Sequence, residues 1–162
     1  LAKQINVSNY EAEEFLNSYF AKFPEIKVYM DNTIKFCRKS GYVNNIFGRR
    51  SHFSGINDKN FNVRNFQERA AINAPIQGSA SEVMRLAMIR LDKKLSDQKN
   101  INSKMLLQIH DELIFEVPKK EEKAMVKLIK SEMTSVAQSD YHSFSTPLTV
   151  DINVGDNWGM LH

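Results

Sequence analysis

Three ionisable residues, His110, Asp111 and Glu112, lie between two apolar runs in the stretch LLQIHDELIFEV, residues 106–117. The flanking runs alternate in the manner of strands, so we expect the triplet at the reversal of a β-hairpin. A tight turn between antiparallel strands fixes side-chain directions, and the two carboxylates would project from a stiff support. Adjacent carboxylates are hard oxygen ligands that suit Mg²⁺ or Mn²⁺ beside substrate phosphates. A charged turn that is simply solvated has the same pattern, so spacing alone leaves both interpretations open.

A second set of polar residues, Arg69, Asn73 and Gln77, recurs every four positions in a segment with helical periodicity. This spacing places them on roughly one side of a helix, and all three carry hydrogen-bond donors. The minor groove of DNA presents purine N3 and pyrimidine O2 acceptors at every correctly formed base pair. A row of donors can therefore test base-pair geometry without reading sequence, although a solvated helix face would have the same spacing.

The window around this helix is rich in cations. Asp58 and Glu68 are its only acids, and its five cations are Arg49, Arg50, Lys59, Arg64 and Arg69. Such a surface suits phosphate groups. The whole chain is only mildly basic, with a formal charge of +3, which permits nucleic acid as a partner without requiring it.

The elements that must position these residues can be predicted from periodicity and from end signals. Ser8 and Glu11 have the spacing of a capping box, Pro24 suits the first turn of a second helix, and Gly41 supplies a stop. Helices are expected at residues 9–23, 24–40, 62–95 and 121–137. Pro75 interrupts the hydrogen-bond ladder of the third, so we expect a kink there and a continuation from Gln77. Strands are expected at residues 42–53, where two of them flank a turn at Phe47-Gly48, and at 104–117 and 147–155. Helices followed by strands and one further helix indicate an α+β fold.

Length and composition allow one compact domain or two small lobes, since the chain has 162 residues of which 42% are hydrophobic. The single cysteine, Cys37, cannot form an internal disulfide or a thiolate metal cage, and we expect it to be buried. No apolar run approaches the roughly 20 residues of a membrane span, so we expect no membrane partner and a cytoplasmic location. The chain begins without methionine, and we expect it to be a piece of a larger protein.

Several long motifs together resemble one family. ERAAINAPIQGSASEVMRLAMI is followed by LLQIHDELIFEV, with FGRR upstream and VGDNW near the end. In this order and spacing the motifs closely resemble the C-terminal part of the bacterial DNA polymerases of family A, and the match runs through essentially the whole chain. The resemblance implies part of a right-hand polymerase fold. Residues 1–62 would form the C-terminal part of the fingers, with a helical hairpin, a small β-hairpin and a loop, and residues 63–162 would form the C-terminal part of the palm with a partial antiparallel sheet.

The resemblance also implies a role for each candidate site residue. Asp111 matches a catalytic palm aspartate that binds the magnesium pair, and Glu112 matches the auxiliary acid beside it. His110 matches the residue at the primer end, with Gln108 near it. The remaining matches contact primer-template DNA: Arg69, Asn73 and Gln77 in the minor groove, and Arg64 at template phosphate.

Two family motifs are missing from this sequence. Another palm aspartate is expected in a strand reading like DYSQIELR, and a fingers helix should carry an arginine, a lysine and an aromatic residue for the incoming deoxynucleoside triphosphate. Because two-metal phosphoryl transfer uses carboxylates from both palm motifs, we expect the parent protein to be a DNA-directed DNA polymerase in replication and repair, and this chain alone to be inactive.

Two other functions fit parts of the pattern. A non-catalytic module that binds duplex DNA would use the cationic window and treat the acidic turn as structural. A metal-dependent phosphohydrolase with a His-Asp pair is less favoured, because the other histidines, His52, His142 and His162, lack ligand spacing. In the isolated chain, surfaces that normally pack against missing strands would be exposed, and we expect them to favour dimerisation.

Overall fold

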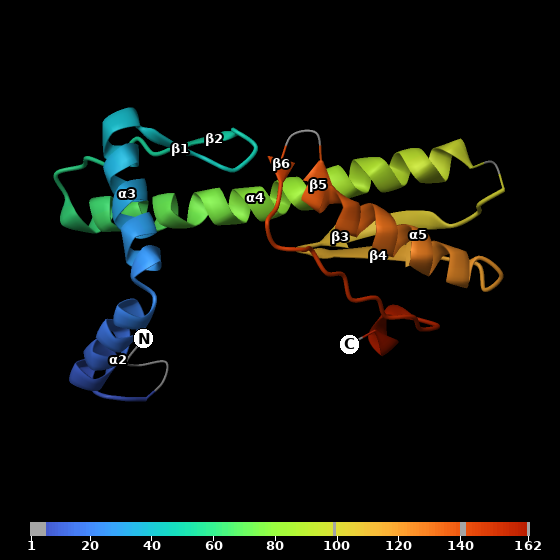
Figure 1. Cartoon of the computed structure of the whole chain (residues 1–162), viewed down its shortest axis with the longest axis horizontal. Coiled ribbons are helices and arrows are strands. Elements are labelled where there is room, and N and C mark those ends of the chain that lie inside the picture. Colours follow the sequence, from blue (N-terminus) through green and yellow to red (C-terminus); the bar gives the residue numbers. More distant parts are fainter. Residues whose placement is uncertain (1–5, 99, 140–141, 162) are drawn as a thin grey trace. The chain divides into compact units, whose positions relative to one another are not determined.

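The structure is a computed structural model that describes residues 6–98, 100–139 and 142–161. The chain forms two compact units. The first contains the chain up to Asn45 together with Arg49–Ile76, and the second contains Ile46–Gly48 together with the chain from Gln77 onward. Figure 1 labels the α-helices and strands of each unit.

Two helices open the first unit, and their ends follow the signals in the sequence. Helix α2 spans Asn9–Lys22, and the predicted capping box is present, because the Ser8 side chain accepts from the backbone N–H of Glu11 while the Glu11 carboxylate accepts from that of Ser8. Helix α3 spans Pro24–Ser40 and ends at Gly41, whose φ of 77° is in the left-handed region that glycine tolerates best.

A small β-hairpin follows α3, as predicted. Strand β1 (Tyr42–Asn44) pairs antiparallel with β2 (Arg50–His52), and Gly48 in the connection has a φ of 82°. The core of the first unit lies where this hairpin meets the helices. Its fully buried residues are Cys37, Val43, Ile56 and Ala71. The prediction that Cys37 is a buried apolar residue is confirmed.

Helix α4 spans Phe61–Asp97 and continues through Pro75. Asn60 caps its start, since the Asn60 Oδ1 accepts a hydrogen bond of 2.9 Å from the backbone N–H of Asn62. The two units divide within this helix, between Ile76 and Gln77. Its second part therefore belongs to the second unit, where Ala87 and Leu91 are fully buried.

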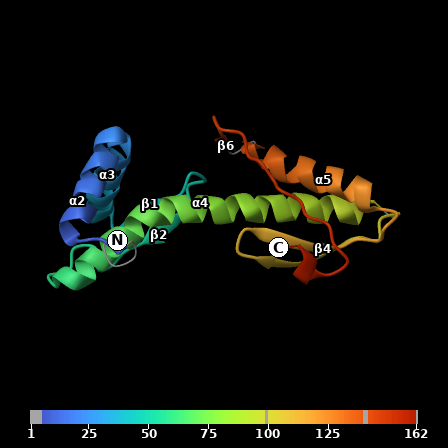
Figure 2. The same ribbon diagram turned by 90° about the horizontal axis from the view of Figure 1, so that it is seen from below.

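The second unit packs a β-hairpin against helices. Strands β3 (Lys104–Ile109) and β4 (Glu112–Glu116) are antiparallel, and α5 spans Glu122–Thr134 and runs into the short helix η1, Ser135–Ala137. Figures 1 and 2 show the hairpin, α5 and the second part of α4 side by side. Their shared core is built on Leu91, Met125 and Ile129, against which Leu113 and Phe115 of β4 pack.

The predicted strand at residues 147–155 is wrong, because this segment has no regular secondary structure. A strand requires a partner to complete its hydrogen-bond ladder, and no described strand pairs with this segment. Part of its apolar alternation is explained by packing, since Ile152 contacts the Leu91 cluster. The strands that do follow α5 are shorter: β5 (Gln138–Ser139) pairs with β6 (His142–Ser143). A short helix, η2 (Trp158–Met160), lies near the C-terminus.

The α+β class is confirmed, with each antiparallel sheet made of two strands. Helix and strand spacing thus predicted the hairpin that carries the ionisable triplet and the helix that carries the row of donors. Within the part of the chain that is described, no helix is both long and apolar enough to span a bilayer.

Candidate active site

The ionisable triplet lies at a two-residue turn. Ile109 and Glu112 form the last pair of the β3–β4 ladder, so His110 and Asp111 are the turn residues and Glu112 begins β4. His110 has a φ of 52°. Positive φ is common in two-residue hairpin turns because it matches the right-handed twist of the strands, but residues other than glycine seldom adopt it. The side chains of all three residues are exposed.

Gln108 supports this turn from β3. Its Nε2 donates a hydrogen bond of 2.9 Å to the carbonyl oxygen of His110. Further along β3 the pairing register shifts between Met105 and Leu107, which leaves Leu106 without a cross-strand partner. Sequence periodicity did not reveal this bulge, because a single extra residue in a short apolar run leaves little trace in the pattern.

The opposite end of the hairpin is tied to α5 by Glu121. Its Oε2 accepts hydrogen bonds from the backbone N–H of Asn102, 2.9 Å, and from both the N–H and the hydroxyl of Ser103, 3.0 and 2.8 Å. These bonds, chiefly that from the Ser103 hydroxyl, lower the pKa of Glu121 below its ordinary value. This anchor was not predicted from the sequence, although a polar Asn-Ser pair directly before a strand was a usable signal.

The turn carries two carboxylates whose chemistry can be compared with that of a metal site. Asp111 and Glu112 are adjacent and exposed, and their oxygens are of the type that Mg²⁺ prefers. Among residues 6–98, 100–139 and 142–161, no three His, Cys, Asp or Glu side chains gather as a metal site would require. The two adjacent carboxylates fit a divalent cation by ligand type, but on their own they are an incomplete ligand set.

The predicted row of donors lies on α4 and is exposed. Arg69 and Asn73 belong to the first unit and lie one helical turn apart, and Gln77 is the first α4 residue of the second unit. Within the described part of the chain, none of the three side chains has a hydrogen-bond or ion-pair partner. Their donors are thus available to a ligand.

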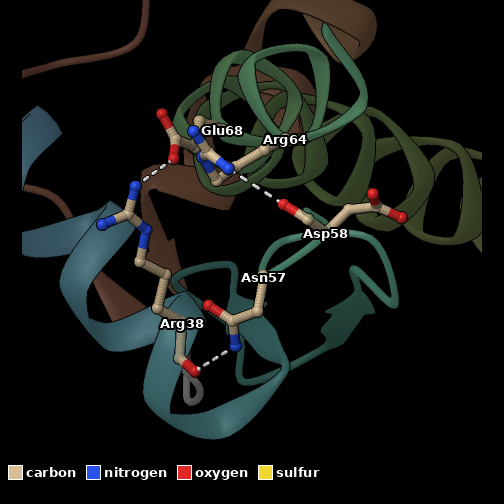
Figure 3. Close-up of polar contacts among 5 residues, drawn as sticks. All are labelled: Arg38, Asn57, Asp58, Arg64 and Glu68. Atoms are coloured by element: carbon tan, nitrogen blue, oxygen red, sulfur yellow. Dashed lines mark hydrogen bonds and ion pairs between the residues drawn. The ribbon is translucent and has the colours of Figure 1, made fainter. Parts of the chain in front are cut away.

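Arg64 is half-buried and has a structural contact (Figure 3). Its Nη1 donates a 2.9 Å hydrogen bond to the carbonyl oxygen of Asp58, and its guanidinium lies 5.6 Å from the ring centre of Phe61. The first contact holds the loop before α4 against the helix. A guanidinium has five N–H donors, so this contact still leaves donors for a phosphate.

A neighbouring ion pair affects the charge of the cationic window. Arg38 at the end of α3 pairs with Glu68 of α4, and the Asn57 side chain donates a 2.9 Å hydrogen bond to the carbonyl oxygen of Arg38 (Figure 3). Because Glu68 is one of the two acids in the window, this pair leaves the local surface more cationic. Arg50 of the same window is exposed, with its guanidinium 4.5 Å from the ring centre of Tyr42.

Comparisons with known proteins agree in pointing to one family. The model of a family described as DNA polymerase family A matches residues 1–160. The chain is 42% identical over 158 residues to DNA polymerase I of Caldicellulosiruptor bescii, covering 98% of this chain and 18% of that protein. It is 45% identical over 158 residues to DNA polymerase I of Streptococcus pneumoniae serotype 4, covering 98% of this chain and 17% of that protein.

A solved structure is also similar. It is described as the POL domain of Pol1 from M. smegmatis in complex with a DNA primer-template and a dNTP. The match has a TM-score of 0.91 and 35% sequence identity, and it covers 99% of this chain and 27% of that chain. The chain thus spans less than a fifth of the length of these curated relatives.

Proposed function

Because the chain belongs to DNA polymerase family A, we propose that it supplies one part of the active site of a DNA-directed DNA polymerase. Such an enzyme adds deoxynucleotides from their triphosphates to a primer 3′-hydroxyl under the direction of a template. The observation that carries the proposal is the β3–β4 turn, which presents His110 and Asp111 on the surface between two paired strands, with Glu112 directly after them.

In this proposal the turn serves the reacting groups. Asp111 and Glu112 would hold Mg²⁺, with Asp111 as the main ligand. When bound, Mg²⁺ supplies the positive charge that stabilises the phosphate oxygens during transfer. The exposed side chain of His110 contacts the primer end, next to the carboxylates. A stiff hairpin suits these roles because phosphoryl transfer depends on accurate placement of groups more than on covalent chemistry by the protein.

The donors on α4 bind the primer-template in the same proposal. Arg69, Asn73 and Gln77 reach minor-groove acceptors that every correct base pair presents. This role is supported by the exposure of the three side chains, which have no hydrogen-bond or ion-pair partner within the described chain. Arg64 contacts template phosphate with the donors that Asp58 leaves free.

The chain alone should not catalyse this reaction. The sequence lacks the second palm aspartate motif and the nucleotide-binding fingers helix that family resemblance leads us to expect. The carboxylates of one turn are an incomplete ligand set for two metal ions. We therefore expect activity only when the remainder of a family A polymerase is supplied.

Primer extension tests the proposal. The assay contains Mg²⁺ and all four deoxynucleoside triphosphates, and it compares the chain alone with the chain mixed with the remainder of its parent polymerase as a separate polypeptide. We expect extension only in the mixture. Asp111→Ala should lower the rate of extension at least about a thousandfold, which corresponds to about 4 kcal/mol of transition-state stabilisation. Asp151→Ala should cause no such loss. Asp151 is a matched control because it is an exposed aspartate of the same unit outside the turn. Extension by the chain alone would show that another carboxylate completes the site.

A second candidate function, duplex binding without catalysis, is favoured by the exposed donors and by the cationic window. Its test is the binding of a labelled primer-template to the chain alone. Arg69→Ala should weaken binding about tenfold, since one good contact contributes about 1–3 kcal/mol, whereas Asp111→Ala should not weaken it. Lys94→Ala is the control, because Lys94 is an exposed cation near the other end of α4. If Arg69→Ala and Lys94→Ala lower the affinity for primer-template equally, the chain binds DNA by general charge attraction and not through the donor row.

A further inference from the structure

The turn residue His110 has a conformation that needs support. Its φ of 52° brings the Cβ of an L-residue close to its own carbonyl group, and glycine avoids this crowding. The turn contains no glycine, asparagine or proline that would favour its geometry locally. The strand pair Ile109 and Glu112 fixes the ends of the turn but does not fix the peptide plane in its middle.

That peptide plane influences the direction of the Asp111 side chain. The carbonyl group of His110 and the N–H and Cα of Asp111 belong to one rigid planar unit. Rotation of this plane between its two Cα atoms changes ψ of His110 and φ of Asp111, which tilts the Cα–Cβ bond of Asp111 and its carboxylate while leaving the β3–β4 ladder intact. A contact that holds the carbonyl oxygen of His110 therefore restrains the carboxylate of Asp111.

Gln108 makes this contact. Its Nε2 reaches the carbonyl oxygen of His110 at 2.9 Å from two residues upstream, where its backbone is held in β3 opposite Leu113. Leu113 in turn packs on the Leu91 core. The core thus holds β4, β4 holds the backbone of Gln108 in β3, and the Gln108 side chain holds the peptide plane between His110 and Asp111.

We propose that Gln108 is a positioning residue, which orients the Asp111 carboxylate through the carbonyl group of His110 instead of contacting DNA itself. This inference rests on the proposed function for the importance of Asp111, and it differs from the expectation that Gln108 binds DNA near the primer end. It predicts that loss of the Gln108 amide changes the turn and the rate of the chemical step, while the affinity for primer-template stays the same.

The first test does not depend on activity. Gln108→Met keeps the length of the side chain and removes its donor, and Gln98→Met makes the same change at an exposed glutamine of the same unit. In NMR spectra of the isotope-labelled chain, we expect Gln108→Met to shift the amide resonance of Asp111 and to weaken the intraresidue amide-to-Hα Overhauser effect of His110, which is strongest at positive φ. Gln98→Met should change neither signal. Unchanged signals in Gln108→Met would overturn the proposal.

The second test measures kcat and KM for primer-template in the mixture described above. Gln108→Met should lower kcat at least about tenfold and leave KM within about twofold, and Gln108→Lys, which restores a donor of sufficient reach, should recover kcat in part. A raised KM with unchanged kcat would identify Gln108 as a DNA contact, and a lower unfolding temperature with both constants unchanged would make its role purely structural. Either result overturns the proposal. If the wild-type mixture itself fails to extend primers, the proposed function fails, while the NMR signals still decide whether Gln108 sets the turn.

Discussion

His110 combines an unfavourable backbone conformation with a position at the candidate site, and its replacement should separate stability from activity. At φ 52°, glycine would remove the steric cost of left-handed backbone, about 1–2 kcal/mol, and would lose about 0.5–1 kcal/mol to chain entropy. We therefore expect His110→Gly to be neutral or to stabilise the chain by up to about 1.5 kcal/mol, while the polymerase mixture loses activity. Urea unfolding and primer extension measure the two effects.

The control for this substitution is His52→Gly. His52 is also exposed, but it lies within β2, pairs with Tyr42 and has no positive φ. Here glycine should destabilise the chain by about 0.5–1 kcal/mol. Equal destabilisation by both glycine substitutions would show that the conformation of His110 carries no strain.

The β3–β4 hairpin packs against a core that is centred on Leu91. Its side chain is fully buried between α4, α5 and β4. Leu91→Ala should lower the free energy of unfolding by about 2–5 kcal/mol, because the cavity cannot close completely around the lost atoms. Ile89→Ala, at a half-exposed position on the same helix, should cost less than about 1 kcal/mol. Thermal unfolding followed by circular dichroism compares the two, and similar losses would contradict a core centred on Leu91.

At the scale of elements, Glu121 joins the start of β3 to the start of α5, and this connection should depend on pH. Its pKa is lowered in the folded chain, so the unfolded chain binds more protons near the ordinary carboxyl pKa. The resulting stabilisation is fully present above the unfolded pKa and is lost as the pH falls through the folded pKa. We expect Glu121→Gln to make the free energy of unfolding, measured with urea, depend less steeply on pH in the acid range.

Glu122→Gln is the matched control for that experiment. Glu122 is the next residue and lies in the first turn of α5, where it lacks the contacts with Asn102 and Ser103 within the described chain. Its replacement should leave the slope of this pH dependence in place. A slope that Glu121→Gln does not change would mean that the pKa of Glu121 is the same in the folded and the unfolded chain, which contradicts the prediction.

Some elements could be predicted from the sequence and others could not. The difference is that only some of them are specified by signals within a few neighbouring residues. The capping box at Ser8, the stop at Gly41 and the alternation around His110-Asp111 act within a few residues, and each predicted its element correctly. The strand expected at residues 147–155 failed because a strand depends on a partner, which alternation alone cannot supply. Likewise, neither the positive φ of His110 nor the hydrogen bond from Gln108 has a local sequence signal, since both depend on how β3 and β4 pair.

At the scale of the whole molecule, each unit leaves large apolar side chains exposed. Phe61 and Phe66 in the first unit are 64% and 61% exposed, and Leu106 in the second is 53% exposed. Leu106 lies at the bulge of β3 beside Leu107, which is itself 42% exposed. Neighbouring exposed apolar side chains favour association with another protein surface. We propose that these exposed apolar side chains let the chain associate with itself.

We therefore expect the mass measured by light scattering to rise above 18.7 kDa toward that of a dimer as concentration increases, together with binding of a dye specific for apolar surface. The double substitution Leu106→Ser and Leu107→Ser should reduce both signals, because it removes apolar area from β3 without touching the Leu91 core. Ser51→Ala with Ser54→Ala, which changes exposed serines of the first unit, should reduce neither. Addition of the remainder of the polymerase should suppress self-association in wild type, because the same apolar surface would then be covered by its partner. A monomer at all concentrations with little dye binding would contradict this expectation. It would mean that the leucines on β3 stay exposed to water without causing association.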